Sequence, residues 1–126
     1  MSRWLALLSI LVLSAAARAA TPDEQAAAQY AIGIAAFNLA QYEPAIAAFE
    51  AAYRHKEDPK FLFNTAQAHR LAGHGPLAVR FYRSYLRLVP DSPLRAAIEA
   101  RIAELDKPES PAVTLIAAPA PTLVAI

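Results

Sequence analysis

The sequence predicts an all-α protein made of two helical hairpins and one further helix. An internal repeat is the first reason, because the stretch at residues 42–53 returns 33 residues later at residues 75–86. The second reason is a proline behind a capping residue at expected helix starts, as in Asp58-Pro59, since proline suits the first turn of a helix. The third is that small residues recur where two helices of a hairpin would cross.

The two copies match over both expected helices of the hairpin. Small residues stand at equivalent places, and an aromatic residue follows four positions after the small residue of the second helix. A match of this kind predicts two copies of one structural unit stacked side by side. The equivalent pairs are Tyr30 and Phe63, Gly33 and Ala66, Ala35 and Ala68, Ala40 and Gly73, Ala45 and Ala78, Ile46 and Val79, and Phe49 and Tyr82.

A period near 34 residues, with Ala-x-x-x-Phe or Tyr on the second helix, resembles the tetratricopeptide repeat. The resemblance covers residues 26–90, about half of the chain. It implies two hairpins of the tetratricopeptide type, forming a fragment of an α-solenoid. The matching residues are Gly33, Ala45, Phe49 and Pro59 in the first copy, and Ala66, Gly73, Ala78, Tyr82 and Pro90 in the second.

Composition limits the possible classes of protein. The 126 residues give room for one domain, and cysteine is absent, which excludes a disulfide framework, a thiolate nucleophile and a cysteine metal site. Without Arg3 and Arg18, which lie in a segment that we expect to be removed, 10 basic residues stand against 11 acidic ones. This balance gives no indication of a polyanionic ligand, and we expect no nucleic-acid partner.

Residues 1–19 are predicted to be a secretory signal peptide, cleaved before Ala20. Arg3 supplies the positive start, an uncharged and mostly apolar run follows from Trp4 to Ala17, and Ala17-Arg18-Ala19 has small residues on both sides of its centre. The alternative is an uncleaved anchor, but the run is shorter than the ~20 residues of a spanning helix. We therefore expect an exported protein, most simply a periplasmic one or else a secreted one.

Five helices are expected in a helical-repeat domain at residues 20–107. Thr21 can cap the first helix, with Glu24 placed as in a capping box, and this helix should reach Asn38. The second helix should contain Pro44 in its first turn and end near Lys56. The third should run from Asp58-Pro59 to about Ala72. The stretch at 73–76 should break the chain and start the fourth, which should end before Pro90, and the fifth should open at Ser92-Pro93.

The fifth helix, at residues 93–107, is expected to cover the open end of two repeats at about 26–59 and 60–92. Repeat arrays need a terminal unit with a polar outer face in order to stay soluble. We therefore interpret this helix as a cap rather than as a binding helix. Leu94, Ile98, Ile102 and Leu105 recur on one side of it, whereas Arg95, Glu99 and Glu104 fall largely on the other.

Residues 108–126 are predicted to form a flexible tail rich in proline and alanine. No charge follows Glu109, yet Pro119 and Pro121 interrupt the apolar run and argue against a spanning helix. Two roles remain open for this tail, which are docking on another surface and continuation into a longer architecture.

Common catalytic and ligand-binding motifs are missing from the sequence. None of the serines stands in a Gly-x-Ser-x-Gly turn, and three glycines cannot build a phosphate-binding loop. The histidines form no His-x-x-x-His pair and have no neighbouring carboxylate cluster, so we expect no metal site. We predict a protein that is not an enzyme and needs no cofactor. The histidines concerned are His55, His69 and His74.

Basic residues follow one side of the fourth helix next to aromatic residues. Such interleaving can bind nucleic acid, but export argues against that, and an amphipathic helix normally has an aromatic core side and a charged solvent side. A weaker functional option is contact with an acidic partner or anionic lipid headgroups. The basic residues are Arg80, Arg83 and Arg87, and the aromatic ones are Phe81, Tyr82 and Tyr85.

Resemblance to tetratricopeptide repeats implies a partner groove on the concave side, formed by the first helix of each hairpin. Three of the groove residues have i, i+4, i+7 spacing, which an ordinary core stripe would also show, so both interpretations stay open. Placed on that architecture, the groove contains Tyr30, Ile34, Phe37 and Asn38 from the first helix, and Lys60, Phe63, Asn64, Gln67 and Arg70 from the third.

Some family members hold the terminal carboxylate of a peptide with lysine and asparagine side chains. Asn64 fits one such position, but Tyr30 and Ile34 stand where lysine and asparagine would be needed. A protein or peptide segment with apolar anchors is the better match. The chain also resembles small exported bacterial proteins with tetratricopeptide repeats, and this resemblance implies a place in the cell envelope. We therefore predict a non-enzymatic protein-interaction module of the bacterial cell envelope.

Two rival hypotheses accompany this prediction. Two repeats are fewer than the three or so that usually make a stable array, so the chain could pair with itself as a homodimer and bury the Tyr30 side. The second rival is an enzyme of unrecognised type, with a pocket that contains Asn64 together with His69 or Arg70.

Overall fold

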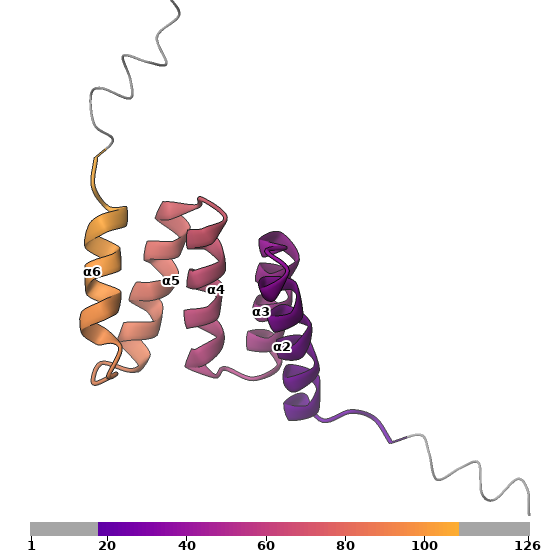
Figure 1. The fold of residues 1–126 in the computed structure, drawn as a ribbon. Helices are drawn as coiled ribbons and strands as arrows, with labels where there is room; N and C mark the ends of the chain where they lie inside the picture. Colours follow the sequence, from indigo (N-terminus) through magenta and orange to yellow (C-terminus); the bar gives the residue numbers. More distant parts are fainter. Residues whose placement is uncertain (1–17, 109–126) are drawn as a thin grey trace, which may run out of the picture.

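The computed structural model describes residues 18–108, and within this range the protein is entirely helical. Most of the predicted signal peptide and most of the predicted tail lie outside these residues. The helices follow one another in chain order from α2 at one end of the array to α6 at the other (Figure 1). They span Pro22–Asn38 (α2), Tyr42–His55 (α3), Pro59–Leu71 (α4), Gly75–Leu88 (α5) and Arg95–Leu105 (α6).

The two predicted caps are present at the starts of α2 and α4. The Thr21 hydroxyl accepts a hydrogen bond from the backbone N–H of Glu24 at 3.2 Å, and the Asp58 carboxylate accepts one from the N–H of Lys60 at 3.0 Å. Each cap satisfies a donor that the first turn of a helix leaves free. The expected capping box is only half formed, because the Glu24 carboxylate pairs with Arg18 at 2.6 Å instead of turning back to Thr21.

The packing confirms two helical hairpins, α2 with α3 and α4 with α5, joined through the contact of α3 with α4. Ala45 and Ala78 are both 0% exposed, as expected for residues at which two helices cross. Phe49 and Tyr82, one helical turn further along α3 and α5, are also 0% exposed. This arrangement is consistent with a fragment of a helical solenoid.

The α2–α3 and α4–α5 turns use the same backbone device. Ala40 has a φ angle of +57° and Gly73 one of +84°, so each places a left-handed residue two positions after its helix. The backbone N–H of the next residue, Gln41 or His74, then reaches back to the carbonyl of Ala36 or His69. Such a bond closes the C-terminal end of a helix and reverses the chain.

The last helix starts later than expected. Ser92-Pro93 was predicted to open it, but α6 begins at Arg95. The Ser92 hydroxyl accepts a hydrogen bond from the N–H of Leu94 at 3.1 Å and also meets the Tyr85 hydroxyl at 2.8 Å, so this segment forms a turn anchored on α5. Leu94 therefore lies 42% exposed in the turn, which corrects its expected place on the packed side of the helix.

The rest of the apolar side of α6 lies where it was expected. Ile98 is buried in one cluster with Ala66, Tyr82 and Leu86, and Ile102 packs against that cluster. The helix thus covers α5 and ends the described array with a mostly exposed outer side. None of the described helices is long and apolar enough to cross a membrane.

Candidate partner-binding surfaces

The predicted groove residues of α2 are built into the packing between three helices. Tyr30, Ile34 and Phe37 are half-buried and lie against the cluster that contains Phe49. The Tyr30 ring centroid is 6.1 Å from that of Phe49 and 5.5 Å from that of Phe61. Aromatic rings at such separations stabilise each other. These three residues therefore have a packing role, as in the core-stripe interpretation, and expose only part of their surface.

The C-terminal end of α2 takes less part in this packing than the Tyr30 region does. The Phe37 ring meets the Tyr42 ring edge-on, with centroids 5.8 Å apart, across the turn between α2 and α3. Asn38 is the last residue of α2 and is exposed. It is the only exposed residue among the four predicted groove residues on this helix.

The start of α4 brings Lys60 next to Tyr30, as the groove prediction requires. The Lys60 ammonium lies 5.1 Å from the Tyr30 ring centroid and 5.2 Å from that of Phe61, a cation–π arrangement. It also stands 3.7 Å from the Asp58 carboxylate. A small cavity of about 150 Å³ opens beside this cluster, and Lys56 borders it as well.

Further along α4, the predicted residues turn toward α5. The Phe63 ring packs against Tyr82 and Tyr85, at centroid distances of 6.2 and 5.6 Å. The Gln67 side-chain oxygen accepts hydrogen bonds from the Tyr82 hydroxyl and, at 3.4 Å, from Arg70 Nε. Phe63 thus packs against α5, whereas Tyr30 packs against α3 and the start of α4, although the two are equivalent in the repeat.

A row of polar groups follows one side of α4, and of these Gln67 already accepts hydrogen bonds within the protein. Lys60, Asn64 and Gln67 have i, i+4, i+7 spacing and so share one side of the helix. Lys60 is exposed, whereas Asn64, Gln67 and Arg70 are half-buried. We call the surface formed by the nine predicted residues of α2 and α4 the α2/α4 surface.

His69 lies in the core beside α5. It is 6% exposed, its ring stacks on Phe81 at 5.3 Å with an 18° interplanar angle, and its Nδ1 is 3.1 Å from Nδ1 of His74. Burial, and next the charge of His74, lower the pKa of His69, against the opposing influence of Glu50 and Glu43. Its burial and stacked ring give His69 a packing role. Among residues 18–108, no three potential ligands are grouped for a metal ion.

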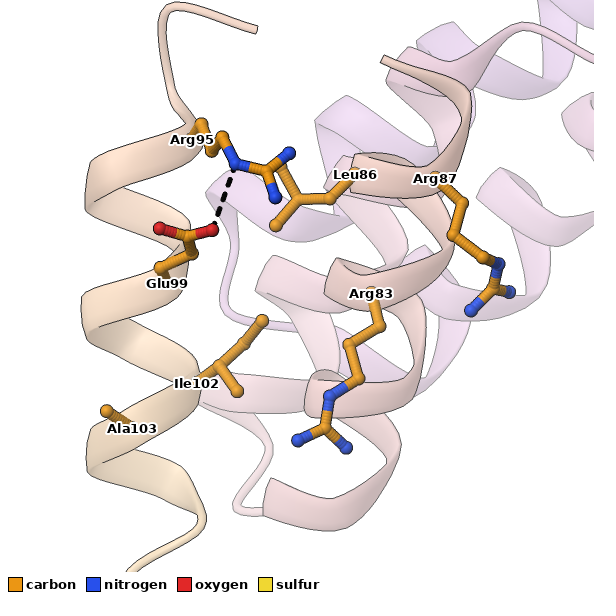
Figure 2. Close-up of a pocket in the computed structure, with 7 residues that line it drawn as sticks. All are labelled: Arg83, Leu86, Arg87, Arg95, Glu99, Ile102 and Ala103. Atoms are coloured by element: carbon orange, nitrogen blue, oxygen red, sulfur yellow. Dashed lines mark ion pairs between the residues drawn. The ribbon is translucent and has the colours of Figure 1, made fainter. Parts of the chain in front are cut away.

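A larger open space lies between α5 and α6, and we call it the α5/α6 groove. Its volume is about 490 Å³, which is within the range of ligand pockets. Leu86 from α5 and Ile102 from α6 point toward one another across it (Figure 2). The remaining lining residues are Arg83 and Arg87 from α5, and Arg95, Glu99 and Ala103 from α6.

Guanidinium groups dominate the rim of this groove. Arg95 pairs with Glu99 at 2.9 Å, and Arg83 pairs with Asp106 at 2.7 Å. Arg87 donates to the Ser84 hydroxyl at 2.9 Å and forms no salt bridge within residues 18–108. Arg83 and Arg87 were predicted to share one side of their helix, whereas no lining residue of α6 was predicted to belong to a site.

Comparison with known proteins adds no relative to this geometry. Neither the protein-family models, nor the curated proteins, nor the solved structures gave a match. Each candidate surface is therefore supported by the contacts and charges of its own residues.

Proposed function

We propose that the protein is a non-enzymatic interaction module of the bacterial cell envelope, of the tetratricopeptide type, that binds a segment of another protein on the α2/α4 surface. The proposal includes export under the predicted signal peptide. Adjacent hairpins of this type offer a partner the first helices of both repeats at once, which suits an extended or helical segment.

The observation that carries the proposal is the polar row on α4 next to half-buried aromatic groups of α2. Lys60 places an ammonium over Tyr30, and Asn64 follows one helical turn later on the same side. A surface that combines a few polar groups with partly covered aromatic rings can fix the register of a bound segment by hydrogen bonds and bury apolar anchors.

The packing of α2 decides which residues should be changed in a test. Tyr30, Ile34 and Phe37 support the core, so their removal would combine loss of binding with loss of stability. Asn38 and Lys60 are exposed and can be replaced with little effect on folding.

Site-specific cross-linking tests the proposal directly. A photoreactive amino acid is placed at Asn64, and, as a matched control, at the exposed Ala100 of α6. We expect cells to yield a defined product from position 64 that is absent from position 100 and is reduced by Lys60→Glu. Mass spectrometry then identifies the cross-linked segment. Equal products from both positions, or none from position 64, would count against the α2/α4 surface.

A further inference from the structure

The α5/α6 groove combines an apolar floor with a cationic rim. Leu86 is buried and Ile102 is half-buried, and both line the space between the helices. Three arginines border it against a single glutamate. The groove therefore offers apolar burial and positive charge along the same lining, at a place separate from the α2/α4 surface.

The carboxylates that already pair with these arginines are easily exchanged. Glu99 and Asp106 have side chains that are 54% and 47% exposed, and ion pairs exposed to this extent contribute little to stability. An incoming carboxylate can replace either one at little cost. Arg87 needs no exchange, because a serine hydroxyl is its side-chain partner.

Spacing of the cationic groups suits a peptide. Arg83 and Arg87 are four residues apart on α5 and project from adjacent turns (Figure 2), so they can meet two carboxylates of one short segment. Arg80 lies a further three residues back and is also exposed. Guanidinium groups bind carboxylates through paired hydrogen bonds, which adds geometric selectivity.

We infer that the α5/α6 groove binds an acidic segment of a partner protein that inserts an apolar side chain between Leu86 and Ile102. Charge complementarity selects the acidic segment, and the recessed floor selects the anchor. A bilayer surface fits less well, because membrane binding requires apolar groups that protrude into the lipid, whereas these two lie between helices.

Peptide selection followed by variant analysis tests the inference. Random twelve-residue peptides displayed on phage are selected on the purified protein, and the best binders are synthesised with a fluorescent label. We expect enrichment in aspartate and glutamate around at least one aliphatic or aromatic residue. Binding should weaken with added salt, because exposed charges are screened.

Two matched pairs of variants locate the bound peptide. Arg87→Glu should weaken binding about tenfold or more, through loss of charge-assisted hydrogen bonds, whereas Arg101→Glu on the same end of the molecule should not. Ala103→Phe should fill the groove and block the anchor, whereas Ala100→Phe should be neutral. Both arginines and both alanines are exposed, and circular dichroism confirms that all four variants fold.

The outcomes are decisive in either direction. If selection returns no peptide that depends on Arg87 and Ala103, the inference is overturned. If the selected peptides instead lose binding in Lys60→Glu and keep it in Arg87→Glu, they belong to the α2/α4 surface. Co-sedimentation with phosphatidylglycerol vesicles, lost in Arg87→Glu without any peptide binding, would replace the partner protein by a membrane.

Discussion

The first and second hairpins hold the same aromatic position in different ways. In the first, the Phe49 ring lies directly against Gly33, and an added Cβ there would come within 2.5 Å of a ring carbon. In the second, Ala66 replaces the glycine, and the Tyr82 hydroxyl donates to Gln67. The two helices of a repeat can therefore pack around an apolar ring alone or around a ring with a buried hydroxyl, provided that the hydroxyl has a hydrogen-bond partner.

The hairpins also differ in what covers the side of their first helix that faces the start of the array, which we call the leading side. α4 turns three residues toward the first hairpin, whereas the equivalent residues of α2, which begins the described array, face solvent. Position in the array, rather than local sequence, therefore decides which small or apolar residues are core. The buried residues are Phe61, Thr65 and Ala68, and the exposed equivalents are Ala28, Ile32 and Ala35.

An aspartate on each leading side should give the largest difference between the hairpins. Thr65 is 1% exposed and Ile32 is 55% exposed. Thr65→Asp should lower the free energy of unfolding by about 3–5 kcal/mol, because it buries an unpaired charge. Ile32→Asp should change it by no more than about 0.5 kcal/mol. Urea unfolding followed by circular dichroism measures both.

A large loss of stability in Ile32→Asp would contradict the exposure of this side of α2. It would mean that the side of α2 is covered in solution, as self-association of the protein would cause. Sizing chromatography of the two variants next to the unmodified protein separates the cases, since only a covered side would release a monomer in Ile32→Asp.

Exchange of the small residues at the helix crossings should give the next largest effect. Gly33→Ala should destabilise the protein by about 1–3 kcal/mol, because the added methyl group meets the Phe49 ring in a filled core. Ala66→Gly in the second hairpin should cost about 1 kcal/mol, through the higher backbone freedom of glycine in a helix. Thermal and urea unfolding provide the comparison. A rise in stability in Gly33→Ala, as helix propensity alone would give, would show that Phe49 can move aside.

The two turns should respond to substitution in opposite directions. Ala40 holds a left-handed conformation that Gly73 adopts freely. Ala40→Gly should therefore raise the free energy of unfolding by about 0.5–1 kcal/mol, and Gly73→Ala should lower it by a similar amount. The double exchange, measured by the same unfolding experiment, should lie close to zero. Destabilisation by Ala40→Gly would show that flexibility gained in the unfolded chain outweighs the relief of strain.

The sequence allowed the repeat to be predicted because its signals are local. Caps at Thr21 and Asp58 and small residues at Ala45 and Ala78 follow rules that operate over a few residues or one repeat period. The α5/α6 groove depends instead on how α6 lies against α5. The start of α6 was predicted too early because the Ser92 hydroxyl bonds to the Tyr85 hydroxyl of α5, and this contact exists only in the folded protein.

On the α2/α4 surface, too, some features were predictable from the sequence, whereas others depend on contacts between helices. The resemblance to tetratricopeptide repeats groups Tyr30 with Lys60, and in the structure the Lys60 ammonium lies 5.1 Å from the Tyr30 ring centroid. The resemblance could not divide Tyr30 from Phe63, because the repeat makes the two equivalent while their neighbours differ. Phe63 meets two tyrosines of α5, and neither of the positions equivalent to them in α3, Phe49 and Ala52, is a tyrosine.

The smallest effect that we expect depends on pH and comes from a histidine pair, His69 and His74, that only the second hairpin contains. The equivalent residues in the first hairpin are Ala36 and Gln41. Burial, and next His74, lower the pKa of His69 in the folded protein, while Glu50 and Glu43 raise it less. The unfolded chain therefore takes up a proton at a higher pH than the folded one. The contribution of His69 to stability should be greatest above pH ~6.5. It should fall as the pH drops below this value, until the pKa of His69 in the folded protein is passed.

His74→Gln, which introduces the residue of the first hairpin, isolates the contribution of the pair. It removes a charge that opposes protonation of His69, so the loss of stability between neutral and acidic pH should become smaller while burial keeps part of it. Urea unfolding from pH 5 to 8 measures the slope, and NMR titration of the His69 ring assigns it. An unchanged slope would leave burial against Phe81 as the sole cause, and a rise in stability on acidification would show that Glu43 and Glu50 outweigh burial.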